Sequence, residues 1–336
     1  MKAPLFIALA AATFSVGPNH VYAQSSGYKV VNTLHIQSAG KWDYVAINPV
    51  SSNVYLSHGT QVNVLNSKGD SVGIINNTTG VHGIAFAPAY RKGFTSNGRI
   101  NTVTVFDIKT NEVSAQVKTG ENPDAIMYDP YSKKIVVCNG RSKDLTIIDP
   151  SNNAVVATIA LGGKPETAVS DEKGKIYVDI EDKNEIVVVD IKTMKAVSRW
   201  SVGKGDEPAG LAIDLHTHRL FAGCGNKLLV VVNADNGKIV DNITIGDGCD
   251  GVAFDPALKH IYASNGEGTL SLIKEISPDK YLLIENIPTK KGARTLAVDP
   301  KTHHIYLPTA DFKPLVAGEK RPDMVPGTFQ VLVVGK

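Results

Sequence analysis

Ionisable residues recur in this sequence at intervals of about 40 residues, a spacing that could bring distant charges together. Six of the seven positions in this series can carry charge, and the fifth is an alanine: Asp43, His82, Asp124, Glu166, Ala209, Asp250 and Arg294. Oxygen ligands suit a hard divalent cation, calcium or magnesium, and the candidates are the carboxylates Asp43, Asp124, Glu166 and Asp250. Such a cation could polarise a lactone or ester carbonyl and activate water, with His82 as the general base.

A second polar series follows the first, with one member in most of the repeated intervals. Its members are His58, Asn97, Asn139, Glu181, Asn226 and Asn265. Their amide and carboxylate oxygens could add to a cation site or contact a ligand directly.

The segments that carry both series repeat as well. An apolar pair followed by Asn or Asp, and often by Pro, recurs seven times, as at 45–49, 126–130 and 252–256. In the third repeat, short strands are predicted at 124–128, 134–138, 145–149 and 154–160, between turns rich in Asp, Asn, Gly, Pro and Ser. A repeat of about 40–45 residues with four strands is typical of a propeller blade. The sequence therefore predicts an all-β, seven-bladed β-propeller, a single domain within residues 24–336.

The two ends of the chain predict how the ring closes. The last repeat offers three strands, at 295–298, 304–307 and 329–334, and lacks a fourth. A further strand-like segment, 28–36, precedes the first repeat. We expect it to pair with 329–334, which completes the seventh blade and leaves no open sheet edge.

In such a ring both polar series lie on one face, around the mouth of the axial channel. The favoured interpretation is a ligand- or partner-binding module that uses this face. The alternative is a metal-dependent, lactonase-type hydrolase on the same residues. A third interpretation assigns no ligand: the side chains begin strands at a wet channel, cap turns and pair with Arg294. In each case, like charges held close together would raise carboxylate pKa values.

Three segments of the chain share one strand pattern: 101–107, 145–149 and 186–190. Together with the Asn-Gly loops at 139–140 and 265–266, they resemble the YVTN-repeat β-propellers, the YncE-like family of exported bacterial proteins. The resemblance extends over essentially the whole mature chain and implies a seven-bladed propeller with an axial channel. It implies no single activity, because related propellers include binding proteins, lactonase-like enzymes and heme-carrying domains.

The first residues are typical of a secretory signal peptide. Lys2 precedes an apolar stretch at 5–16, and Val21-Tyr22-Ala23 fits a cleavage site. We expect residues 1–23 to be removed and the mature protein to be periplasmic or secreted, as a monomer without a membrane anchor. The formal net charge of +2 and the acidic series give no support to nucleic-acid binding.

The cysteines and one long connection complete the expectations. Cys224 and Cys249 fall at the channel-face ends of adjacent blades, which favours a disulfide between them, with Cys138 free; the alternative is three unpaired thiols. The connection at 308–328 in the seventh blade is far longer than the usual loop and contains four prolines. A semi-rigid cover over the channel face and an insertion without a role both agree with that composition.

Overall fold

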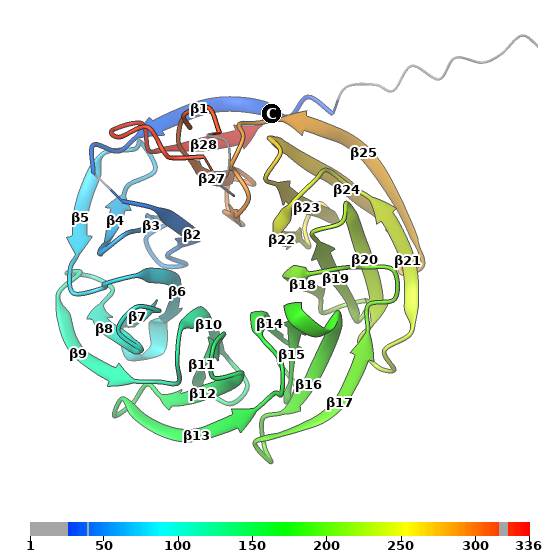
Figure 1. Ribbon diagram of the computed structural model, residues 1–336, viewed down its shortest axis with the longest axis horizontal. Coiled ribbons are helices and arrows are strands. Elements are labelled where there is room, and N and C mark those ends of the chain that lie inside the picture. Colours follow the sequence, from blue (N-terminus) through cyan, green and yellow to red (C-terminus); the bar gives the residue numbers. More distant parts are fainter. Residues whose placement is uncertain (1–25, 39, 316–321) are drawn as a thin grey trace, which may run out of the picture.

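The computed structural model describes residues 26–38, 40–315 and 322–336, and within them the strands form a ring of seven sheets (Figure 1). Each sheet has four strands paired antiparallel, as in the third blade. The first strand of a blade lies beside the central opening and the last lies on the rim (Figure 1). The prediction of an all-β, seven-bladed propeller is confirmed. The expected signal peptide, residues 1–23, lies outside the described residues.

The blades follow one another along the chain. Blade one contains β2 (Trp42–Ile47), β3 (Val54–His58), β4 (Gln61–Leu65) and β5 (Ser71–Ile75). Blade two contains β6 (Val81–Ala87), β7 (Lys92–Asn97), β8 (Thr102–Asp107) and β9 (Val113–Lys118). Blade three contains β10 (Pro123–Asp129), β11 (Lys134–Asn139), β12 (Asp144–Asp149) and β13 (Ala154–Ala160). Blade four contains β14 (Pro165–Ser170), β15 (Lys175–Ile180), β16 (Glu185–Asp190) and β17 (Lys195–Ser201).

The remaining blades have the same order of strands. Blade five contains β18 (Pro208–Asp214), β19 (Arg219–Cys224), β20 (Leu228–Asn233) and β21 (Ile239–Thr244). Blade six contains β22 (Cys249–Asp255), β23 (His260–Asn265), β24 (Thr269–Ser277) and β25 (Lys280–Pro288). Blade seven contains β26 (Ala297–Val298), β27 (Ile305–Thr309), β28 (Gln330–Gly335) and β1 (Lys29–His35). The described residues also form two short 3₁₀ turns, η1 (Pro88–Tyr90) and η2 (Glu181–Lys183), and they include no helix long and apolar enough to cross a membrane.

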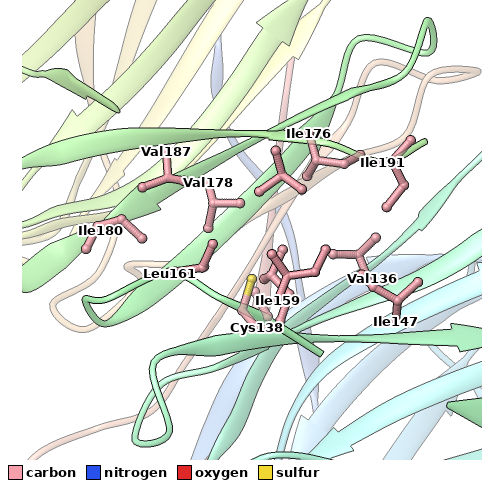
Figure 2. Close-up of a cluster of buried hydrophobic side chains, with 13 residues drawn as sticks. Val136, Cys138, Ile147, Ile159, Leu161, Ile176, Val178, Ile180, Val187 and Ile191 are labelled. Atoms are coloured by element: carbon pink, nitrogen blue, oxygen red, sulfur yellow. The ribbon is translucent and has the colours of Figure 1, made fainter. Parts of the chain in front are cut away.

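The core of the molecule lies between neighbouring blades. The central residues of β12, β16 and β20 are fully buried, as expected for strands that are covered on both faces. Figure 2 shows one such contact, in which Val136 and Ile147 of blade three face Ile176 and Val178 of blade four. Continuous Val and Ile runs in the sequence therefore mark strands enclosed between two sheets.

The ring closes through its N-terminal strand, as predicted. β1 pairs antiparallel with β28, with a register that runs from Lys29 opposite Gly335 to His35 opposite Gln330. β1 is the blue strand outside the red β28 in Figure 1. Leu34 is buried in the same apolar cluster as Trp42 of blade one, so the closing strand also joins the last blade to the first.

The Asp residues that end the first strands form turns and also link blades. Asp129 accepts hydrogen bonds from the Ser132 backbone N–H (2.9 Å) and from the hydroxyl of Ser170 in the next blade (2.6 Å). Asp255 accepts from the Leu258 backbone N–H (3.2 Å) and pairs with His303 Nδ1 of the next blade (2.6 Å). The turn role follows from residue type, whereas the link between blades could not be seen in the sequence.

The expected disulfide between Cys224 and Cys249 is not formed, because the two sulfurs lie in different cores. Cys224 packs in the cluster between blades four and five, and Cys249 in the cluster between blades five and six. All three cysteines are free and buried. The sheet of blade five therefore separates the two thiols that the spacing had paired.

The described part of the long connection in blade seven is a short antiparallel ladder. Phe312 pairs with Met324, and the Val325 backbone N–H donates to the Asp311 carbonyl at 2.8 Å. Phe312 packs against Trp42, with 5.8 Å between ring centroids. This part of the connection lies over the junction of blades seven and one, and a cover across the channel remains a prediction.

We expect Leu34→Asp to destabilise the protein by about 3 kcal/mol or more, because it places an uncompensated charge in the closing core. Urea unfolding would measure the loss. Val31→Asp is the control, since Val31 lies on the same strand and is 40% exposed. Equal stability of the two variants would contradict closure through β1.

Thiol counting tests the cysteine assignment. Burial raises the pKa of Cys138 well above its ordinary value and that of Cys224 to about 12, so little reactive thiolate forms near neutral pH. We expect Ellman's reagent to detect no thiol in the native protein and all 3 cysteines in denaturant. A single reactive thiol in denaturant would restore the disulfide.

Candidate ligand-binding site at the channel mouth

A β-bulge at the start of the first strand places the predicted side chains in six of the blades. The pairing of first and second strands shifts register between Trp42 and Val45, between Val81 and Ile84, and at the matching points of β10, β14, β18 and β22. The series members within these shifts are Asp43, His82, Asp124, Glu166, Ala209 and Asp250. A bulge inserts an unpaired residue and re-aims its side chain, so the recurring interval marks a recurring bulge.

Hydrogen bonds between blades hold these bulges in place. Thr295 Oγ1 of blade seven donates to the Asp43 carbonyl (2.5 Å), and Thr167 Oγ1 of blade four donates to the Ala209 carbonyl (2.7 Å). Ser264 Oγ of blade six donates to the Arg294 carbonyl (2.5 Å). The backbone of a site residue is thus fixed by a hydroxyl of the preceding blade.

The tightest group in the site joins blades one, two and three. His82 Nδ1 lies 2.6 Å from Asp43 Oδ2 and 3.6 Å from Asp124 Oδ1. Potential metal-ligand atoms of these three residues all lie within 4.8 Å of one another. The side chain of His82 is 27% exposed and that of Asp124 is 13% exposed, so the group is accessible from the channel mouth.

Arg294 connects this group to blade six. Its Nε lies 2.5 Å from Asp250 Oδ2, and its Nη2 lies 3.3 Å from Asp43 Oδ1. Asp43 therefore shares its carboxylate between His82 and Arg294. Burial raises the pKa of Asp250 above its ordinary value, and the charge of Arg294 opposes that shift.

Lys164 is a member of the site that the spacing did not identify. It lies two residues before Glu166 and forms ion pairs with Glu166 and Glu181. Burial, the charge of Asp124 and a hydrogen bond with Glu181 raise the pKa of Glu166 to about 10. Lys41 holds the same place before Asp43 in blade one, but the other blades have no lysine there, so the repeat gave no signal for this position.

The carboxyl groups at the mouth outnumber the strong bases. Within the described residues, five carboxyl groups form ion pairs with two strong bases, Arg294 and Lys164, or with His82, which lies between two of the acids: Asp43, Asp124, Glu166, Glu181 and Asp250. Burial and the nearby Asp43 raise the pKa of Asp124 to about 7. Burial lowers the pKa of His82, but the Asp43 hydrogen bond and the Asp124 charge outweigh it, and the net pKa is raised. A group of acids that holds protons near neutral pH can accept a cation in their place.

Four other predicted site residues are buried inside their blades, where a ligand in the open channel would not reach them. They are His58, Asn97, Asn139 and Asn265. His58 contacts Ser38 Oγ (2.5 Å) and the Gly40 carbonyl (2.8 Å), and burial lowers its pKa. Asn139 Nδ2 donates to Thr146 Oγ1 (2.8 Å) on the third strand of the same blade, and Asn97 and Asn265 make matching bonds.

Asn226 has a local role as well. Its Nδ2 donates to the Lys204 carbonyl (2.8 Å), and its Oδ1 accepts from the Asp206 backbone N–H (3.1 Å), so it fixes the loop that leads into blade five. Among the described members of the second series, Glu181 contacts the first series: it hydrogen-bonds with Glu166 and shares Lys164 with it.

An apolar cavity of about 150 Å³ lies among the first strands of blades one to four. Its lining includes Tyr44, Ile84, Ile126, Met127 and Ala168. Four residues of this lining directly follow the site residue of their blade in the sequence: Tyr44, Gly83, Ala125 and Thr167. The cavity therefore adjoins the ionisable groups of the mouth.

No family model and no curated protein sequence matches the chain. Among solved structures, the chain is similar to a chain of Kuenenia stuttgartiensis hydrazine synthase, with a TM-score of 0.71 and 15% sequence identity. The match covers 81% of this chain and 94% of that chain. At this identity the likeness shows the propeller fold and carries no statement about chemistry.

Asp124 gives the site a characteristic pH dependence. Its folded pKa of about 7 exceeds the ordinary 3.8, so its contribution to stability is complete below 3.8 and is lost as the pH rises through 7. Asparagine mimics the neutral carboxyl. We expect Asp124→Asn to raise the free energy of unfolding by about 2 kcal/mol at pH 8 and to leave it unchanged near pH 4.

Urea unfolding at both pH values measures this effect. Asp247→Asn, which removes an exposed carboxylate paired with Lys227 at 3.4 Å, is the control and should show no such difference. An Asp124→Asn effect of the same size at pH 4 and pH 8 would contradict the assignment.

Proposed function

We propose that this protein is an exported binding module whose channel mouth takes a positively charged ligand. The observation that carries the proposal is the group Asp43–His82–Asp124, where two carboxylates share one imidazole and Arg294 pairs only with Asp43 of the two. Lys164 is engaged by Glu166, and Arg294 divides its charge between Asp250 and Asp43. A cationic ligand would supply the charge that these acids lack.

The signal-like N-terminal segment supports export, and the strand patterns that resemble the YncE-like YVTN propellers support the same placement. A rigid ring that presents its loops on one face is suited to binding, and the propeller fold itself does not favour one chemistry over another. A mature monomer in the periplasm or the medium is part of this proposal.

A metal-dependent hydrolase is the second candidate, and one observation favours it. The ligand atoms of Asp43, His82 and Asp124 lie within 4.8 Å of one another, which suits a single ion. An imidazole nitrogen in the set favours zinc or another transition metal over the calcium or magnesium predicted from the carboxylates alone. His82 Nδ1 would then be a ligand, and the general base would have to be another group.

Thermal melts of the mature protein test the proposed function. After chelation, calcium, magnesium, zinc or methylammonium chloride is added, and a cation that binds only the folded state raises the melting midpoint. We expect a rise with at least one of them that is abolished in Asp43→Asn and in Asp124→Asn.

Asp247→Asn is the matched control and should keep the full rise, because this exposed side chain pairs with Lys227 and forms no ion pair with Asp43, His82 or Asp124. Melts that superimpose for all four cations would overturn the proposal. A rise with zinc alone would favour the hydrolase candidate, for which lactone and ester substrates would be assayed next.

A further inference from the structure

The apolar cavity beside the channel mouth is a feature that a bare metal ion would leave unused. On β2, β6, β10 and β14 an ionisable residue at the bulge is followed directly by a residue that lines the cavity. Met127, Ile84 and Ile126 add apolar surface to the same space. The site therefore offers negative charge at its opening and a hydrocarbon environment directly beyond it.

The size of the cavity limits what it can hold. Its volume of about 150 Å³ matches a cavity that accommodates a benzene ring, which corresponds to about six carbon atoms. It is lined by side chains from four blades, and Gly83 contributes backbone alone. A group larger than six carbons would have to extend out of this space.

Tyr44 lies at the boundary between the two environments. It lines the cavity, and it directly follows Asp43 in the chain. Burial, together with the charges of Asp124, Glu166, Asp43 and Asp250, raises the pKa of its phenol, so the ring stays neutral. The face of an aromatic ring attracts a cation held near it.

We propose that the channel mouth binds a small primary amine, with its ammonium group at Asp43 and Asp124 and a hydrocarbon part of up to about six carbons in the cavity lined by Tyr44 and Met127. An ammonium group has three N–H donors, which suits the two carboxylates at this point. This inference rests on the proposed function and names its ligand class.

Calorimetric titration of the mature protein with methyl-, propyl-, hexyl- and decylammonium chloride tests the inference. We expect the affinity to rise by up to about fourfold for each methylene that enters the cavity. The rise should stop near six carbons, where the cavity is full. Hexanoate, which has a similar tail and the opposite charge, should not bind.

Ala168→Leu tests the cavity without changing the charges, because it extends a small lining side chain into the space. We expect it to weaken hexylammonium binding at least tenfold and to leave methylammonium binding unchanged. Asp124→Asn should weaken both amines, and Asp247→Asn should weaken neither.

The outcomes separate this inference from the proposed function. If hexylammonium binds no better than methylammonium, or if calcium, magnesium or zinc binds and no amine does, the amine assignment is overturned and a cation site remains. If no cation of either kind binds, both proposals fail. Should Ala168→Leu not fold, the dependence of wild-type affinity on chain length decides the question.

Discussion

The bulge at the channel end of six first strands is the constraint on which the candidate site depends. Regular pairing would alternate successive side chains between the two faces of a blade, whereas the inserted residue carries its side chain toward the channel mouth. The carbonyl of the bulge residue also accepts a hydroxyl from the preceding blade, as Asp43 does from Thr295. The same residue therefore bears the chemistry and helps to hold the ring together.

Seven equivalent positions do not make a symmetric site. Ala209 leaves a gap between Glu166 and Asp250, and the basic groups lie on either side of the acids of blades one to three. Arg294 neutralises Asp250 and part of Asp43, while Lys164 is shared by Glu166 and Glu181. Asp124 has His82 as its ion-pair partner and pairs with neither Arg294 nor Lys164 among the described residues. The cavity lies among the first strands of blades one to four, beside the same group. Charge and apolar surface thus gather on one side of the channel mouth.

The sequence predicted what repeats and missed what occurs once. The interval of about 40 residues identified the first polar series, and six of its members lie in β-bulges. A local geometry that recurs in each blade requires similar residues at each copy. His58 and Asn97 occupy the same repeat position and are both buried, but the partner of His58, Ser38, lies outside the repeat. Tyr44 has no aromatic counterpart in the other blades, and Lys164 is matched only by Lys41 in blade one. Cys224 and Cys249 are separated by a sheet whose orientation no spacing reveals.

Asp43 shows why ligand binding and ring closure are coupled in this molecule. Its carboxylate is divided between His82 of blade two and Arg294 of blade seven, and its carbonyl accepts from Thr295. A cation that binds Asp43 must compete with Arg294, because both use the same carboxylate. Binding would therefore change the contacts at the junction of blades seven and one, where β1 closes the ring. At the same junction Trp42, the neighbour of Asp43, packs on Phe312 of the long connection. The closure strand, the long connection and the site meet at this single blade junction.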